Sequence, residues 1–445
     1  MFKTIKNAWA LPDLRKKILF TLFIIVVFRI GSAIPVPFLD TVALKGVMDK
    51  VAQSGTALSY LDTLSGGAFA QATLFAMSVT PYINSSIVVE LLTVAIPALE
   101  RMAKEGEEGR KRLGAITRYV AVGLGLVQAI FFYFYLRNSA YEGHYIVKYR
   151  EGWQGVFTAF VIILTFTAGA ALMMWLGEQV NQHGIGNGIS ILLFAGIVSR
   201  MPHVFNTLGQ FWTAANQDPS SYGKYYFLVP LFVVLFIVMM WVIVFMYDSE
   251  RRIPVQYAKR MVGRKMYGGQ SSHIPIKVGL SGVMPIIFAS SILIIPSTIQ
   301  FFLGDRVNNN PFWKSFFEAF STTGWVYSIL YFILIIAFAY FYMTIQYNPI
   351  EMANNLRQNN GTIPGIRPGK PTSDYIMKVL SKVTFIGSLF LAFIALLPII
   401  FGASTGMSSL SIGGTSLLIL AGVALETVKQ MESQMMMRHY KGFLD

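Results

Sequence analysis

The chain has 445 residues, of which 54% are hydrophobic and only 13% are charged. Together with a mean hydropathy of +0.54, this composition indicates a polytopic membrane protein whose outer surface is covered by lipid. Cysteine is absent, which excludes a disulfide framework, a thiolate metal site and a cysteine nucleophile. The net charge of +14 favours an anionic partner, which is lipid headgroup, nucleic acid or an acidic protein face.

Ten apolar runs are long enough to cross roughly 30 Å of hydrocarbon. They lie near 18–37, 74–99, 115–136, 154–176, 185–201, 225–247, 278–303, 324–347, 380–401 and 408–428. The first run follows basic residues, as a cleaved leader does, but Arg29 interrupts it and it continues to Pro37, so we interpret it as a span. Arg29 either snorkels to the interface or braces neighbouring helices.

Lysine and arginine are distributed unequally between the two sides of this pattern. Most of the 36 fall before the first span, in every second loop and after the last span, which predicts that both termini are cytoplasmic. Two loops on that side, near 248–277 and 348–379, are long and basic, and loops of that length usually carry function.

The link near 202–224 divides the chain into an N-terminal half, 1–205, and a C-terminal half, 206–445, with five spans each. Because five is odd, the second half enters the membrane from the opposite face, which is the topology of inverted repeats.

The stretch "LDTLSGGAFAQATLFAMSVTPYINSSIVVELLTV", residues 61–94, changes character along its length. Its first third is small and weakly polar, and we expect a short, unstable half-helix at 61–72, since Gly66 and Gly67 each lower helix stability by roughly 1 kcal/mol relative to alanine. The apolar helix that follows carries Asn84, Ser85 and Ser86. These side chains are tolerable at depth only if they face a water-filled vestibule or another helix.

Enzyme and nucleotide sites find little support. No histidine pairs with an acid at metal-ligand spacing, and "GIGNGIS" at 184–190 has neither a preceding strand nor a following lysine, so we expect its glycines to allow close helix packing. Glu90, Glu178 and Glu426 fall near the cytoplasmic ends of their spans, where we interpret them as interface anchors.

Long ungapped motifs carry a resemblance to a known family. They are "FRIGSAIPVP" (28–37), "VTPYINSSIVVELLTV" (79–94), "GIGNGISILLFAGIV" (184–198), "RRIPVQYAKR" (251–260), "GVMPIIFASSI" (282–292), "NPIEMANNLRQNNGTIPGIRPG" (348–369) and "GGTSLLIL" (413–420). In these motifs, which spread over nearly the whole chain, the sequence resembles the bacterial SecY family of protein-conducting channels. The implied fold is an all-α polytopic membrane protein, with ten transmembrane helices in two inverted, pseudo-symmetric halves around an hourglass pore.

The resemblance implies three sets of site residues. The pore ring, carried over by motif, is Ile83, Ile87, Ile189, Leu193, Ile287 and Ile419. The plug, near 61–72, is Leu64, Ser65, Gly66, Gly67, Ala68 and Phe69. The cytoplasmic residues that receive a motor or ribosome are Arg251, Arg252, Lys259, Arg260, Arg264, Lys265 and Arg367.

The resemblance also implies the partners and the location. We expect a bacterial plasma membrane protein that assembles with SecE and SecG and receives the SecA motor or the ribosome. It would pass signal peptides and unfolded polypeptides, and it would open to membrane lipid at a lateral gate between its second and third helices on one side and its seventh and eighth on the other. No cofactor and no ATP site are expected in this chain.

Two other classes of protein are alternative interpretations of this sequence. A secondary transporter of a small solute, built on inverted repeats, would need a polar substrate site at the midplane, and none is evident. A membrane-embedded hydrolase would need a nucleophile and base among the helices, and none is found.

Overall fold

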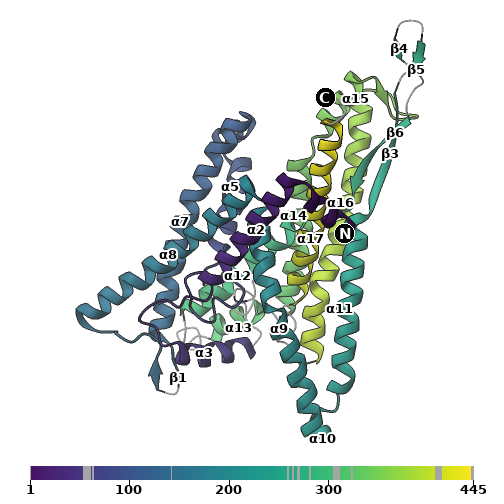
Figure 1. Ribbon diagram of the computed structural model, residues 1–445. Coiled ribbons are helices and arrows are strands. Elements are labelled where there is room, and N and C mark those ends of the chain that lie inside the picture. Colours follow the sequence, from purple (N-terminus) through teal and green to yellow (C-terminus); the bar gives the residue numbers. More distant parts are fainter. Residues whose placement is uncertain are drawn as a thin grey trace.

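The computed structural model describes the chain except for residues 1, 54–61, 63–64, 142, 258–259, 263–264, 268–270, 280–281, 304–310, 322–323, 406–412 and 442–445. Long helices run side by side through most of the molecule, and short strands project at one end (Figure 1).

Each of the ten predicted spans corresponds to a helix. These helices are α2 (Pro12–Gly31), α5 (Thr80–Ala95) with α6 (Pro97–Lys104), α7 (Glu107–Asn138), α8 (Gly152–His183), α9 (Gly188–Gln217), α11 (Tyr225–Asp248), α12 (Met284–Leu303), α14 (Trp325–Gln346), α16 (Lys370–Thr405) and α17 (Gly413–Lys441). Among the described residues, six helices are long and apolar enough to cross a membrane by themselves, or seven if α5 and α6 count as one bent span.

The second span differs most from the prediction. Residues 74–79 form turns, so the helix begins at Thr80 rather than near residue 74. At its other end α6 turns away from α5 by 101°. The bend follows from Pro97, because a proline disfavours helical backbone at the residue before it, and Ile96 is extended with φ −110° and ψ 113°.

The expected half-helix at 61–72 is wrong for residues 65–72, which form consecutive turns, whereas Asp62 before them is helical. Gly66 and Gly67 have φ values of +68° and +91° in these turns. Glycine is needed at these two positions for a left-handed backbone rather than for a weak helix.

Shorter elements lie at the two ends of the helical body. They are α1 (Phe2–Ala10), α3 (Thr41–Gln53), α10 (Pro219–Tyr222), α13 (Pro311–Ala319), α15 (Pro349–Gln358), β1 (Ala140–Tyr141) and β2 (His144–Tyr145). α3, α10 and the hairpin β1–β2 lie at one end of the molecule, whereas α15 lies at the other (Figure 1).

The two long basic loops form one structured platform at the α15 end. Its strands are β3 (Glu250–Tyr257), β4 (Arg260–Val262), β5 (Lys265–Tyr267), β6 (Ser271–Lys277) and β7 (Gly361–Thr362). β3 pairs antiparallel with β6 and also with β7, so a strand of the first loop binds the second loop. Beneath this sheet, Ile253, Val255 and Ile276 are almost fully buried, so the loops are held by a core of their own.

The largest apolar core draws on both halves of the chain, with buried side chains from α2, α5, α8, α9, α11, α12, α14, α16 and α17. A second core belongs to the N-terminal part alone, and Phe69, Phe132 and Phe166 lie in it. The turns at 65–79 contribute to both cores, so this segment lies where the two cores meet.

Candidate pore and its closure

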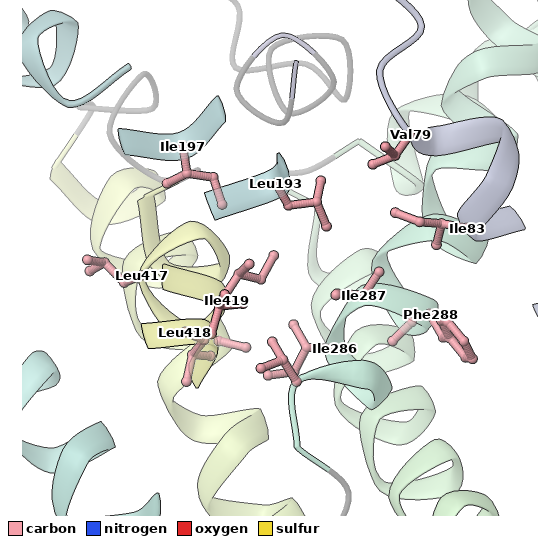
Figure 2. Packing of buried hydrophobic residues seen from close by; sticks show 14 of the residues in the cluster. Val79, Ile83, Leu193, Ile197, Ile286, Ile287, Phe288, Leu417, Leu418 and Ile419 are labelled. Carbon is pink, nitrogen blue, oxygen red and sulfur yellow. The ribbon is translucent and has the colours of Figure 1, made fainter. Parts of the chain in front are cut away.

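Aliphatic side chains from four helices meet in the centre of the large core. Figure 2 shows Ile83 of α5, Leu193 of α9 and Ile287 of α12 directed toward one another, with Ile419 of α17 completing the group. Their exposed fractions are 7%, 2%, 5% and 0%. With no polar group among these side chains, the cluster offers an ion nothing to replace its water.

The two remaining ring residues also lie at this cluster. Ile87 is one turn from Ile83 on the same face of α5 and is buried in the same core. Ile189 is only partly buried and packs at the edge of the core, where its Cδ1 lies against Gly177 of α8.

Sequence reasoning missed several members of the cluster. Val79, Ile197, Ile286, Leu417 and Leu418 lie beside the ring residues (Figure 2) and are almost fully buried. The carried-over motifs named one or two residues per helix, whereas residues one or two positions away (Ile286, Leu417 and Leu418) and one turn away (Val79 and Ile197) share the contact.

The plug segment is buried more completely than its small side chains suggest. Ser65, Ala68 and Phe69 are at most 4% exposed, and the Phe69 ring stacks on Phe132 of α7 with centroids 4.7 Å apart. Leu74 packs against the large core. Leu64 lies outside the described residues.

Polar contacts that the sequence did not predict also hold the plug. Asp62 is 5% exposed and forms an ion pair with Arg200, near the middle of α9. Arg29 of α2 donates a hydrogen bond to Ser199 Oγ at 2.9 Å and a longer one to the Gly66 carbonyl at 3.4 Å. Arg29 therefore braces neighbouring segments, which decides between its two expected roles.

Two polar residues of α5, Ser85 and Glu90, have partners on other helices, whereas Ser86 donates to Glu90 within α5. Ser85 donates to the Thr117 carbonyl of α7 at 2.9 Å, as the requirement for a neighbouring helix demands. The carboxylate of Glu90 accepts a hydrogen bond of 2.6 Å from Tyr342 of α14, and Glu178 pairs with Arg118 of α7 at 2.7 Å. Both acids therefore have partners on neighbouring helices, and their interpretation as interface anchors stays a prediction.

The glycines of "GIGNGIS" allow close packing, as expected. A Cβ at Gly188 would overlap the Gly177 carbonyl. Asn181 accepts from the Gly188 amide at 2.7 Å, and Asn187 caps α9 by accepting from the Ser190 amide at 3.3 Å. These contacts fix the residue at which α9 begins and therefore the position of Leu193.

The predicted docking residues are exposed wherever the structure describes their side chains. Arg251, Arg252 and Arg367 face solvent, and Arg252 pairs with Glu250 at 2.6 Å. Arg260 and Lys265 lie on β4 and β5, at the outer tip of the platform (Figure 1). Lys259 and Arg264 lie outside the described residues.

Comparison with known proteins decides the family. The sequence model of SecY matches residues 73–428. The chain is 44% identical over 449 residues to the protein translocase subunit SecY of Bacillus subtilis, and the match covers 100% of both chains. The chain belongs to the SecY family.

SecY structures share its fold at low sequence identity. One is described as showing that the plug domain of the SecY protein stabilises the closed state of the translocation channel and maintains a membrane seal. It matches with a TM-score of 0.60 at 18% identity, over 94% of this chain and 92% of that one. Sec61 in the canine ribosome–channel complex matches with a TM-score of 0.58, also at 18% identity and with the same coverage.

Membership of the SecY family confirms the predicted function and the main features of the fold. The chain is a multi-pass membrane protein of a bacterial translocase and a protein-conducting channel, which rules out the solute transporter. The family is one of translocation channels and not an enzyme family.

Proposed function

We propose that the polypeptide passes through the ring formed by Ile83, Ile87, Ile189, Leu193, Ile287 and Ile419. The observation that carries this proposal is the convergence of aliphatic side chains from α5, α9, α12 and α17 in one buried cluster (Figure 2). Aliphatic side chains have no directional bonds to lose, so such a ring yields to any passing sequence and closes again behind it.

The second part of the proposal concerns closure. The plug, near 61–72, seals the pore on the external side of the ring and leaves when a polypeptide enters. Its burial against Phe132 and its ties to Arg29 and Arg200 support this role, because they hold the segment against α7, α2 and α9, the last of which carries Leu193 of the ring.

The third part concerns lateral exit. The halves 1–205 and 206–445 would separate where α5 and α7 face α12 and α14, so that an apolar segment of the passing chain enters lipid there. α12 touches both α5 and α7, and Tyr342 of α14 binds Glu90 of α5. The bond from Tyr342 to Glu90 is a polar contact that must break for this seam to open.

The fourth part concerns partners and orientation. Both termini and the platform of β3–β7 are cytoplasmic, and Arg251, Arg252, Lys259, Arg260, Arg264, Lys265 and Arg367 receive the SecA motor or the ribosome. SecE and SecG complete the channel. The chain itself catalyses no reaction, and its partners supply the energy. The platform of β3–β7 supports this proposal because it is a structured basic protrusion. An anionic partner can therefore recognise both its shape and its positive charge.

Reconstitution tests the proposed function. The channel complex, purified with its partner subunits, is placed in lipid vesicles with motor and ATP, and a secretory precursor is added. We expect the precursor to become protected from external protease, and we expect a tenfold excess of a small solute to leave transport unchanged. Vesicles that accumulate the solute and protect no precursor would contradict the proposal.

A further inference from the structure

Two arginines from different helices meet at the Gly66–Gly67 turn of the plug. Arg29 Nη1 of α2 lies 3.4 Å from the Gly66 carbonyl oxygen. Arg200 of α9 lies beside Gly67, with its Nη1 3.6 Å from the place where a Cβ would be. Ser199 joins the two sides, since its Oγ accepts from Arg29 at 2.9 Å and lies 3.3 Å from the Gly66 carbonyl oxygen.

A carboxylate of the plug lies on the Arg200 side of this basic site. Asp62 forms the ion pair with Arg200 through Oδ2, and its Oδ1 accepts from the Ala70 amide at 2.8 Å. Its backbone carbonyl accepts from the Gly67 amide at 2.9 Å. Asp62 therefore both shapes the turn and fastens it to α9.

The arginine of α9 lies on the face that carries the ring. Leu193, Ile197 and Arg200 are spaced i, i+4 and i+7, so they share one side of the helix. Leu193 and Ile197 contact the ring cluster (Figure 2). When the plug leaves, Arg200 therefore faces the space through which the polypeptide passes, two turns beyond Leu193.

We propose that Arg29 and Arg200 form a carboxylate-binding site in the external vestibule of the channel. In the closed channel, Asp62 of the plug occupies it. After the plug has moved, acidic side chains of the translocating polypeptide bind there in passing. The inference rests on the proposed path through the ring. Guanidinium suits this role, because it stays charged and binds carboxylates through paired donors.

The closed state gives the first test, by the conductance of the idle channel complex in planar bilayers. Asp62→Asn and Arg200→Gln each raise the idle conductance, and the double variant raises it no further. The exchanged pair Asp62→Arg with Arg200→Asp restores the seal in part, because the two charges pair again while the bond from the Ala70 amide stays lost; a variant that simply misfolds could not do this. Lys45→Gln, which removes an exposed charge of α3, leaves conductance unchanged. An exchanged pair as leaky as the single variants would overturn the closed-state half of the proposal.

The open state gives the second test, with three secretory substrates that differ only in a four-residue patch of Glu, Gln or Lys. In the wild-type channel at low salt, we expect the Glu patch to slow passage about two- to fivefold relative to Gln, as a partly exposed ion pair permits, and the delay to shrink at high salt. The delay disappears in the double variant Arg29→Gln with Arg200→Gln, whereas the Gln substrate still passes.

Equal rates for the Glu and Gln substrates in the wild type, or a delay that survives in the double variant, would overturn the proposal. Failure of the proposed function is distinguishable, because then no substrate, the Gln one included, passes the wild-type channel.

Discussion

Ile287 and Ile419 come from different helices of the C-terminal half and meet Ile83 and Leu193 in the centre of the molecule (Figure 2). Replacing Ile287 with asparagine places an amide in that contact, where a buried polar group without a full set of partners costs about 1–3 kcal/mol. The closed state bears this cost and the hydrated open state does not. The equilibrium therefore shifts toward open about tenfold.

The measurement is export of a reporter whose signal sequence is crippled. We expect Ile287→Asn and Ile419→Asn each to raise export about tenfold, and Ile287→Val, which keeps the contact apolar, to leave it low. Export no better than wild type, from stably inserted asparagine variants, would argue against Ile287 and Ile419 lining the path.

At this scale the resemblance supplied aliphatic positions that meet in one buried cluster, but not the charged contacts. Ile83 and Ile287 could be named because their motifs are continuous in the chain. The bond from Arg29 to Ser199 joins residues 170 apart, and no local pattern reports such a pairing. The available signal was a charge inside a span, which requires a partner at depth without identifying it.

The plug is an element whose burial and polar ties together oppose its movement. Deleting 61–72 removes Phe69 from Phe132 and Asp62 from Arg200, while the aliphatic ring remains. We expect such channels to translocate at close to the wild-type rate and to conduct ions when idle. Bilayer conductance measures this, and a deletion as ion-tight as wild type would show that the segment is not a barrier.

Tethering the plug to α7 by a disulfide should block translocation, the opposite of deleting the plug. Phe69→Cys with Phe132→Cys replaces two stacked rings, and the absence of native cysteine leaves only this pair to oxidise. We expect oxidation to block translocation and a reductant to restore it. Each single cysteine variant serves as the control and should transport under both conditions.

The cytoplasmic platform is the second element with a direct test. Arg367 is exposed, and within the described part of the chain its side chain has no hydrogen bond or ion pair, while its backbone carbonyl accepts from Thr372 Oγ1 at 2.8 Å. Arg367→Glu should therefore leave folding intact and lower motor-driven translocation at least about tenfold.

Arg264→Glu with Lys265→Glu should weaken partner docking, and the loss should diminish as salt rises. Normal transport by well-expressed Arg367→Glu vesicles, or docking indifferent to charge and salt, would contradict these roles.

Helices and strands could be predicted from the sequence where the residues that determine them lie close together in the chain. Hydropathy placed α7, α8 and α11 well, because each is a continuous apolar run. The turns at 65–79 were missed because left-handed glycines and contacts with α2 and α9, not hydropathy, determine them. The pairing of β3 with β7 joins residues about a hundred positions apart, and no periodicity reports it.

At the scale of the whole molecule, the described residues place one side-chain hydrogen bond of α5 across the seam toward α14, from Tyr342 to Glu90. Tyr342→Phe removes only the hydroxyl. Since such a bond contributes roughly 0.5–1.5 kcal/mol, we expect the seam to open about two- to tenfold more often, so that less hydrophobic segments enter lipid.

Tyr340 provides the matched control, because its hydroxyl binds the Ser381 carbonyl within the C-terminal half at 3.2 Å. A series of test segments with increasing leucine content measures membrane insertion. Tyr342→Phe should lower the leucine content needed, and Tyr340→Phe should not. An identical threshold in wild type and both variants would mean that this bond does not hold the seam.

The path of the polypeptide is tested most directly by disulfide trapping of a stalled chain. A secretory substrate with one cysteine is halted in the channel complex, and single cysteines replace Leu193, Ile287 or, as a control, Ile333, which is 53% exposed on the outside of α14. We predict disulfides at Leu193→Cys and Ile287→Cys as the substrate cysteine comes level with the ring, and none at Ile333→Cys. Trapping at Ile333→Cys with none at the two ring positions would contradict the account.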